Sequence, residues 1–377
     1  MSGEREWPFP RIPEEKVKQD LKEIFANEEL VPRLKGASKE VREYFCSDEF
    51  INALVHCYDD VMAFRNAVMS PLLQAEFTRL RHEENDADEL WSSKWQRKLR
   101  QIKDGHAEEP TSEEEKEILE TVDEMVRTRG EAIAKRGEAR VVLFSVFNRL
   151  LWWFFPLNKK FADPFEFEGH NDFKSSFADI QKEFFAVYEK MGKGEKCPTL
   201  GELDPSNNYI SRPFNNEKAW KTFFFRIYGQ DVENNKNECP TVKKLVEKYN
   251  DSVTTAMFSF LLGKRHIVKH QGPYKGVYRY HLGLRIPAEE KGRCEIVNGD
   301  VPQRWTEGDA ILFDDTFTHE VFNDTNELRA LLFLDVVRPL PHPYLDFLNR
   351  YMINIFQGTR DLQEVSSKAE QSIPIES

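Results

Sequence analysis

The sequence is poor in cysteine and contains none of the spacings that cysteine frameworks use. The five cysteines of the 377-residue chain are Cys46, Cys57, Cys197, Cys239 and Cys294. Their odd number and the lack of a CxxC pair argue against a disulfide framework or a zinc ribbon. We therefore expect reduced thiols in a cytoplasmic protein. The first fifteen residues also lack an apolar stretch, so we expect no secretory signal peptide.

Positive charge is scarce relative to negative charge. The chain has 53 Lys and Arg against 65 Asp and Glu, a net charge of −12 at pH 7. Nucleic-acid binding depends on Lys and Arg at phosphates, so this balance argues against a nucleic-acid-binding protein. Hydrophobic residues make up 40% of the chain, which is ample for a large core and for one or two domains.

Helical periodicity marks the N-terminal part of the chain. The first run has apolar residues at i, i+4, i+7 and i+8, namely Val17, Leu21, Ile24 and Phe25. A second periodic run covers about residues 48–81, with a break at Ser70-Pro71. A capping-box sequence at Ser112 predicts a third helix to about Lys135. The pattern predicts an all-α region over residues 1–165.

The apolar run from Val141 to Leu157 has two interpretations. It is 17 residues long, whereas a membrane-spanning helix needs about 20. It also contains Asn148 and Arg149, which are costly in the middle of a bilayer. We therefore expect a buried helix that docks the helical region onto the following domain. Its crowded aromatics and flanking lysines leave membrane association at an interface as the alternative.

The stretch from Ser259 to Arg329 reads as short strands. Residues 277–282 alternate and place Arg279 and His281 on one face, the pattern of a half-buried strand. Residues 330–337 form an apolar run interrupted only by Asp335, as in a strand covered on both faces. Short strands separated by Asn-Gly and Glu-Gly-Asp turns predict a β-sandwich or a small barrel with a ligand pocket in its mouth.

Histidines concentrate in the same stretch. Four of the nine fall within it, His266, His270, His281 and His319. Neutral imidazoles suit Fe, Zn, Cu and Ni, and two histidines with open coordination positions are typical of non-haem Fe(II) oxygenases. Any single histidine is more simply explained as a satisfied core or surface residue. A helical zinc pair at His266 and His270 is disfavoured by the β-branched residues between them.

The stretch resembles the aspartyl/asparaginyl β-hydroxylase family of Fe(II)- and 2-oxoglutarate-dependent oxygenases. The matching pieces are FS at Phe258-Ser259, HxGP from His270, RxHLGLxIP from Arg279, W-x-E-G from Trp305, FDDxFxHEV from Phe313 and LR at Leu328-Arg329. The resemblance covers roughly residues 170–345. One departure is Val277, where the animal peptide hydroxylases of the family carry a basic residue.

The resemblance implies a role for each matched residue. His270 and His319 correspond to the iron ligands, and Gly272 stands where the usual facial triad has its carboxylate. Arg279 and His281 correspond to the residues that contact the C1 carboxylate end of 2-oxoglutarate. The pair corresponding to the residues that hold its distal carboxylate is Ser259 and Arg329. The implied catalytic residues are His270, His319 and Arg279, whereas His266 is expected to be structural.

The resemblance also implies the architecture and the reaction. We expect an α+β chain with a helical region at 1–165, a double-stranded β-helix (jelly-roll, cupin-like) dioxygenase domain at 166–345, and a C-terminal helix and tail at 346–377. The reaction would use Fe(II), 2-oxoglutarate and O₂ to hydroxylate an unactivated C–H bond, releasing succinate and CO₂. The substrate would be an amino acid, a peptide or a related small molecule. The alternatives are a lipid acyl hydroxylase at a membrane surface and a non-catalytic helical interaction protein with a degenerate barrel.

Overall fold

The computed structural model describes residues 12–57, 59–83, 138–155, 159–203, 220–272, 274–357 and 368–369. The chain divides into two compact units. Of the described residues, those within 12–83, 138–159 and 339–355 belong to the helical unit, and those within 160–338 and 356–369 belong to the sheet unit. These limits differ from the predicted limits at 165 and 345, because the chain returns to the helical unit after residue 338.

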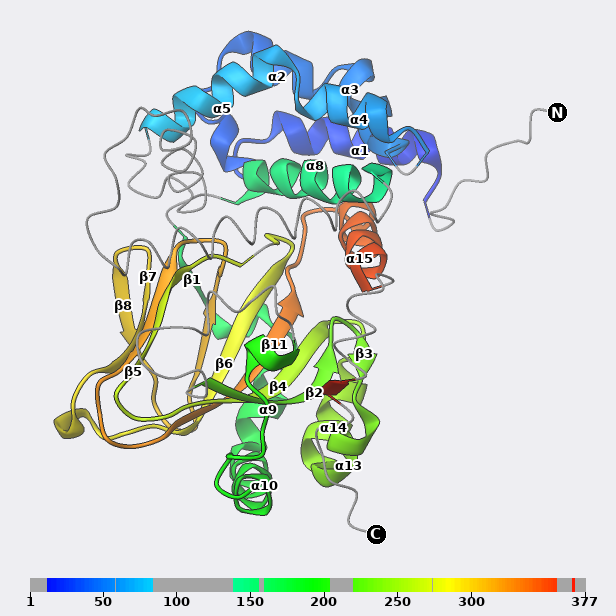
Figure 1. Cartoon of the computed structure of the whole chain (residues 1–377). Coiled ribbons are helices and arrows are strands. Elements are labelled where there is room, and N and C mark those ends of the chain that lie inside the picture. Colours follow the sequence, from blue (N-terminus) through cyan, green and yellow to red (C-terminus); the bar gives the residue numbers. More distant parts are fainter. Residues whose placement is uncertain are drawn as a thin grey trace, which may run out of the picture. The chain divides into compact units, whose positions relative to one another are not determined.

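The described residues of the helical unit form a set of helices (Figure 1). They are α1 (Glu14–Ala26), η1 (Pro32–Leu34), α2 (Lys39–Phe45), α3 (Asp48–Val55), α4 (Val61–Val68), α5 (Pro71–Glu83), α8 (Glu138–Phe154) and α15 (Pro343–Gln357). The periodic run over 48–81 is three helices rather than two, because Asp60 caps a new helix by accepting a hydrogen bond from the Ala63 amide. The predicted helix from Ser112 to Lys135 lies outside the described residues.

Helix α8 lies in the core of the helical unit. Its buried side chains are Leu143, Val146, Phe147, Leu150, Leu151, Trp153 and Phe154. The helix packs against α4 and η1, and Trp153 contacts Phe45 edge to face at 5.1 Å. The charged Arg149 side chain of α8 is held by two contacts with α5. Its guanidinium lies 3.7 Å from the centre of the Phe77 ring and donates a hydrogen bond to the Gln74 side chain. Among the described residues, no helix has the length and apolar character that crossing a membrane requires.

The sheet unit contains two antiparallel sheets. The seven-stranded sheet has the order β1 (Phe161–Ala162), β9 (Ala310–Phe313), β6 (Val277–Arg285), β11 (Arg329–Val337), β4 (Val253–Leu261), β2 (Trp220–Ile227), β3 (Gln230–Asp231). The four-stranded sheet has the order β5 (Arg265–His270), β10 (His319–Asn323), β7 (Cys294–Asn298), β8 (Val301–Arg304). From β4 to β11 the chain passes back and forth between the two sheets, which brings residues distant in sequence onto facing surfaces.

Apolar side chains fill both sides of the large sheet. The remaining helices of the sheet unit are η2 (Pro164–Glu166), α9 (His170–Ser175), α10 (Phe177–Lys190), α11 (Leu200–Leu203), α13 (Glu233–Glu238), α14 (Pro240–Lys248) and η4 (Glu289–Lys291). One cluster joins α10 and α14 to the outward residues of β6, including Tyr280 and Leu282. A second cluster, which includes Ile296 and Leu331, fills the space between the sheets. The predicted strands at 277–282 and 330–337 are confirmed, and the inner face of β6 carries Arg279 and His281.

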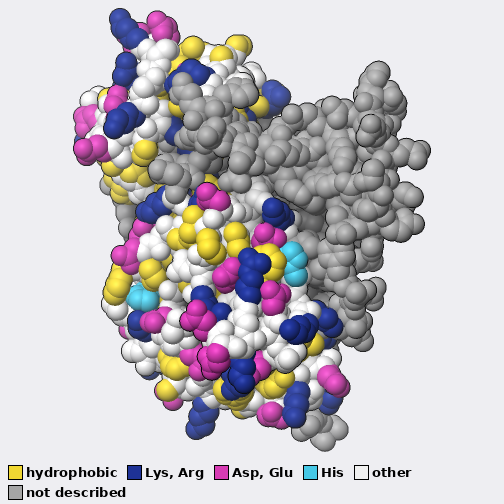
Figure 2. All heavy atoms as spheres, turned by 90° about the vertical axis from the view of Figure 1, so that its left-hand side faces the viewer, with side chains coloured by type: hydrophobic (Ala, Val, Ile, Leu, Met, Phe, Trp, Pro, Cys, Tyr) yellow, Lys and Arg dark blue, Asp and Glu magenta, His cyan; other side chains and the backbone are white. Residues whose placement is uncertain are grey.

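One face of the molecule carries charges of both signs. On the face shown in Figure 2, basic and acidic side chains of the described residues are interspersed with apolar ones.

Candidate active site

Two histidines meet where the four-stranded sheet pairs β5 with β10. His270 ends β5, His319 begins β10, and the two residues lie directly opposite each other in the ladder. Their ring centroids are 4.1 Å apart and both side chains are buried. The fold therefore joins two imidazoles that are 49 positions apart in the sequence.

A β-bulge determines which histidine of β5 faces inward. Ile267 lies opposite Val321 and His270 lies opposite His319, so residues 268–269 both face the single residue between those partners. In a regular strand, His266 and His270 would lie on the same face, but one extra residue reverses the alternation. His266 instead stacks on Phe322 at 4.2 Å and forms an ion pair with Glu320 at 3.0 Å. It is thus directed away from the histidine pair.

The surroundings of His319 favour its neutral, metal-ligating form. Its Nδ1 lies 2.9 Å from the carbonyl oxygen of Phe317, so an Nδ1–H donates there and Nε2 keeps its lone pair. Burial, followed by the electrostatic effect of the neighbouring His270 and Arg279 side chains, lowers the pKa of His319 well below its ordinary value. The imidazole is therefore a ready donor to a metal ion at neutral pH.

A carboxylate from a different loop lies over Gly272. The Gly272 amide donates to the Asp315 carbonyl at 2.6 Å, and a Cβ at position 272 would lie 1.8 Å from Asp315 Oδ2. The Asp315 carboxylate thus occupies the volume that a side chain at 272 would need. It is paired with Arg279 Nη2 at 2.8 Å. Burial raises the pKa of Asp315 to about 7, although Arg279 opposes this shift.

The inner face of β6 places Arg279 and His281 beside the histidine pair. Arg279 Nε donates to Asp335 at 3.1 Å, and its guanidinium lies 4.5 Å from the Phe333 ring centre. His281 is enclosed by aromatic rings, with Phe333 and Phe313 at 5.0 Å. Neither ring nitrogen of His281 has a hydrogen-bond partner among the described residues, and burial lowers the pKa of His281 well below the ordinary value. A buried neutral imidazole with two open positions is suited to binding a ligand.

Ser259 and Arg329 lie on the same inner face, on the neighbouring strands β4 and β11. Arg329 Nη1 is 3.5 Å from Ser259 Oγ, and Trp220 Nε1 donates to the same oxygen at 2.9 Å. Arg329 is 2% exposed, and burial lowers its pKa to about 10. Its guanidinium lies 5.1 Å from the Trp305 ring centre. Over the part of the chain that the structure describes, no carboxylate forms an ion pair with Arg329, so the cation remains uncompensated.

The residues present fit an iron ion with a dicarboxylate. Two neutral imidazoles suit Fe(II), and an uncompensated buried arginine suits a carboxylate. Within the described ranges, no three His, Cys, Asp or Glu side chains converge as a metal site, and His270 and His319 remain the predicted donor pair. The six predicted site residues face the space between the two sheets: His270 and His319 belong to the small sheet, and Ser259, Arg279, His281 and Arg329 belong to the large one. Sequence reasoning missed Trp220, whose contact with Ser259 spans 39 positions.

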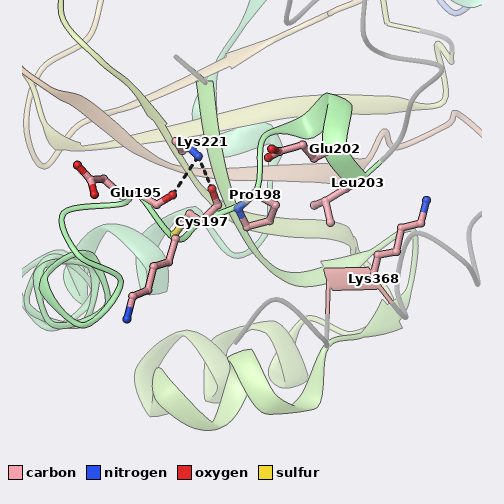
Figure 3. A pocket seen from close by; sticks show the side chains of 8 residues that line it. Glu195, Cys197, Pro198, Glu202, Leu203, Lys221 and Lys368 are labelled. Carbon is pink, nitrogen blue, oxygen red and sulfur yellow. Dashed lines mark hydrogen bonds between the residues drawn. The ribbon is translucent and has the colours of Figure 1, made fainter. Parts of the chain in front are cut away.

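A separate hollow lies on the sheet unit near the start of β2 (Figure 3). Its volume is about 300 Å³ and its lining residues are Glu195, Lys196, Cys197, Pro198, Glu202, Leu203, Lys221 and Lys368. Lys221 Nζ donates to the backbone carbonyls of Cys197 at 2.5 Å and Glu195 at 3.4 Å. This lysine is engaged by the hollow's own backbone, and the hollow is distinct from the histidine pair.

Comparisons with known proteins agree with this geometry. Residues 174–339 match the aspartyl/asparaginyl β-hydroxylase family. The chain is 35% identical over 191 residues to the ornithine lipid ester-linked acyl 2-hydroxylase of Rhizobium tropici, covering 50% of this chain and 66% of that protein. It is 32% identical over 124 residues to the aspartyl/asparaginyl β-hydroxylase of Mus musculus, covering 32% of this chain and 16% of that protein.

These matches span less than two thirds of the relatives' own lengths. Among solved structures, a prolyl hydroxylase from Trichoplax adhaerens, solved with a peptide fragment of hypoxia inducible factor, aligns with a TM-score of 0.32 and 13% identity, over 47% of this chain and 81% of that chain. The family match covers the strands that carry all six predicted site residues. Residues 174–339 of the chain belong to the aspartyl/asparaginyl β-hydroxylase family.

Proposed function

We propose that this protein is an Fe(II)- and 2-oxoglutarate-dependent dioxygenase that hydroxylates an unactivated C–H bond. The observation that carries the proposal is Arg329, a buried cation beside Ser259 without a carboxylate partner among the described residues. Burying an unpaired charge costs several kcal/mol, so a fold retains one only where a ligand compensates it. The distal carboxylate of 2-oxoglutarate supplies that compensation.

The strand order supports a double-stranded β-helix. Strands β4, β6, β9 and β11 lie in the large sheet, and the intervening strands β5, β7, β8 and β10 form the small one. A jelly roll has this arrangement of two facing antiparallel sheets. The histidine pair and the inner face of β6 then lie between the sheets, where ligands of such folds bind.

His270 and His319 would hold the iron through their ring nitrogens. Iron and 2-oxoglutarate together supply the oxidation with O₂ that inserts one oxygen into the substrate and releases succinate and CO₂. The hydrogen bond from His319 Nδ1 to the Phe317 carbonyl would leave Nε2 free to bind the metal. The aromatic rings of Phe313 and Phe333, which flank His281, would limit the access of water to the site.

Arg279 and His281 would receive the other end of the cosubstrate. His281 lies opposite Phe333 in the ladder and offers two ring nitrogens that have no hydrogen-bond partner among the described residues. Arg279 is held by two carboxylates, Asp315 and Asp335, so its position is fixed before a ligand arrives. A preformed arrangement lowers the entropy that binding would otherwise lose.

The relatives favour two substrate classes. The Rhizobium tropici relative is named for an ester-linked acyl group of a lipid, and the mouse relative for aspartyl and asparaginyl residues. Val277 offers no cation for an acidic side chain. This favours an acyl or other uncharged substrate over an aspartyl peptide, with an amino acid or small molecule as the further candidate.

Succinate release from 2-oxoglutarate tests the proposal. Wild-type protein should form succinate only with added Fe(II), and more of it when an acyl lipid or a peptide serves as substrate. His270→Ala should abolish the reaction. His266→Ala is the matched control, because this histidine lies on the same strand but faces Phe322 and Glu320. Equal activity of His270→Ala and wild type would refute the site.

A further inference from the structure

A buried group of three charges lies next to the histidine pair. Its members are Lys275, Asp314 and Arg338, which are 4%, 1% and 1% exposed. Asp314 Oδ2 accepts hydrogen bonds from Lys275 Nζ at 2.6 Å and from Arg338 Nη2 at 2.8 Å. Its Oδ1 accepts from the hydroxyl and amide of Thr316 at 2.6 and 3.1 Å. Both carboxylate oxygens are thus fully occupied within the protein.

The charge group joins the two segments that carry the histidines. Lys275 lies in the segment that follows His270, and Asp314 lies in the segment that precedes His319. Arg338 follows β11 and also binds the first segment, because its Nη1 donates to the Lys275 carbonyl at 3.2 Å and its amide donates to the Gly276 carbonyl at 2.9 Å. The group therefore ties both segments to the end of the central strand.

Two further bonds connect the same segments closer to the imidazoles. Gln271 Nε2 donates to Thr318 Oγ1 at 3.0 Å, one residue from each histidine. The Gly272 amide donates to the Asp315 carbonyl at 2.6 Å. These contacts connect the two segments at successive positions along the chain. The Lys275–Asp314 ion pair is the one farthest in sequence from the two histidines.

Stability alone does not account for burying these charges. Removing three charges from water is costly, and replacing a buried ion group by apolar residues is often neutral or stabilising. Burial would raise the pKa of Asp314, but the charges of Arg338 and Lys275 outweigh it and hold the pKa below its ordinary value. A charge-assisted arrangement permits one geometry, whereas apolar packing tolerates several.

We propose that Lys275, Asp314 and Arg338 are positioning residues that fix the spacing of His270 and His319 for metal binding. None of the three would contact the metal or the cosubstrate. Both carboxylate oxygens of Asp314 accept hydrogen bonds within the protein, from Lys275, Arg338 and Thr316. The inference rests on the proposed two-histidine site and adds to it the means by which two separate segments keep their imidazoles in register.

The test compares Asp314→Asn with Asp231→Asn. Asp231 is the matched control, because it also lies between a buried arginine and a buried lysine, Arg226 at 2.6 Å and Lys236 at 2.9 Å. It lies on β3, and three strands separate β3 from β6 in the sheet order. Co(II) affinity is measured by calorimetry without cosubstrate or O₂, at a temperature where circular dichroism shows each variant folded.

We expect Asp314→Asn to bind Co(II) at least tenfold more weakly than wild type, and Asp231→Asn to stay within twofold. Lys275→Met serves as the second variant, because it keeps the Asp314–Arg338 pair and decides the matter if Asp314→Asn does not fold. Equal weakening by Asp231→Asn, or Co(II) binding within twofold of wild type in Lys275→Met and any folded Asp314→Asn, would overturn the positioning role. Lack of Co(II) binding by wild type would instead refute the two-histidine site, and the positioning role with it.

Discussion

Replacing Gly272 by alanine tests the placement of the Asp315 carboxylate directly. An added Cβ would lie 1.8, 2.1 and 2.3 Å from Asp315 Oδ2, Cγ and Oδ1, whereas ordinary contacts begin at 3.4 Å. The carboxylate would have to retreat by about 1.6 Å, the difference between the shortest of these distances and an ordinary contact. Asp315 is 1% exposed and paired with Arg279, so this retreat breaks a buried ion pair.

The expected cost follows from overpacking. Added atoms in a filled interior typically destabilise by about 1–3 kcal/mol, and loss of the Arg279 contact adds to this. For a unit of this size, each kcal/mol lowers the melting temperature by roughly 2–4 °C. Gly272→Ala should therefore melt several degrees below wild type.

A double-mutant cycle gives the decisive result. Asp315→Ala removes the group that the new methyl meets, so Gly272→Ala should cost much less in that background than in wild type. We expect an interaction energy of about 1–3 kcal/mol, determined by urea denaturation of the four proteins. Effects that add within about 0.5 kcal/mol, or an unchanged melting temperature of Gly272→Ala, would show that the carboxylate does not lie over Gly272.

Four further outcomes are expected. Arg329→Ala should raise the KM for 2-oxoglutarate roughly thirtyfold or more, since one buried charged contact is worth about 2–5 kcal/mol, while Fe(II) affinity stays unchanged; an unchanged KM contradicts the assignment. Turnover in chloride buffer should add one oxygen and no chlorine to the product by mass spectrometry, although Gly272 leaves a coordination position without a carboxylate. Burial raises the pKa of Cys197 to about 12, so native protein at pH 8 should resist alkylation there, and prompt labelling of Cys197 refutes its burial. Phe147→Ala should destabilise the helical unit by about 3–5 kcal/mol in thermal unfolding, because the ring is 0% exposed.

Local patterns in the sequence predicted the elements but not the registers that bring them together. The alternation over 277–282 identified the face of β6 that carries Arg279 and His281, because strand periodicity is a local property. The extra residue at 268–269 could not be predicted, since a bulge is defined only by the partner strand. The Trp220 contact with Ser259 likewise depends on the pairing of β2 with β4.

The limits of the units show the same dependence on tertiary contacts. A C-terminal helix and tail were predicted at 346–377 as a separate region, whereas α15 begins at Pro343 and packs within the helical unit up to residue 355. His342 pairs with Asp20 at 3.1 Å, and the Tyr344 hydroxyl donates to the Val55 carbonyl at 2.7 Å. Partners separated by 322 and 289 positions leave no local signal in the sequence.

This return of the chain has a consequence for biosynthesis. A ribosome delivers α1 and α3 first, but the residues that bind Asp20 and the Val55 carbonyl emerge about three hundred positions later. The helical unit therefore lacks α15 until the sheet unit up to Arg338 has been translated and can fold. A nascent chain stalled when Arg338 has just left the ribosome exit tunnel should show sheets that resist protease and helices that are still digested.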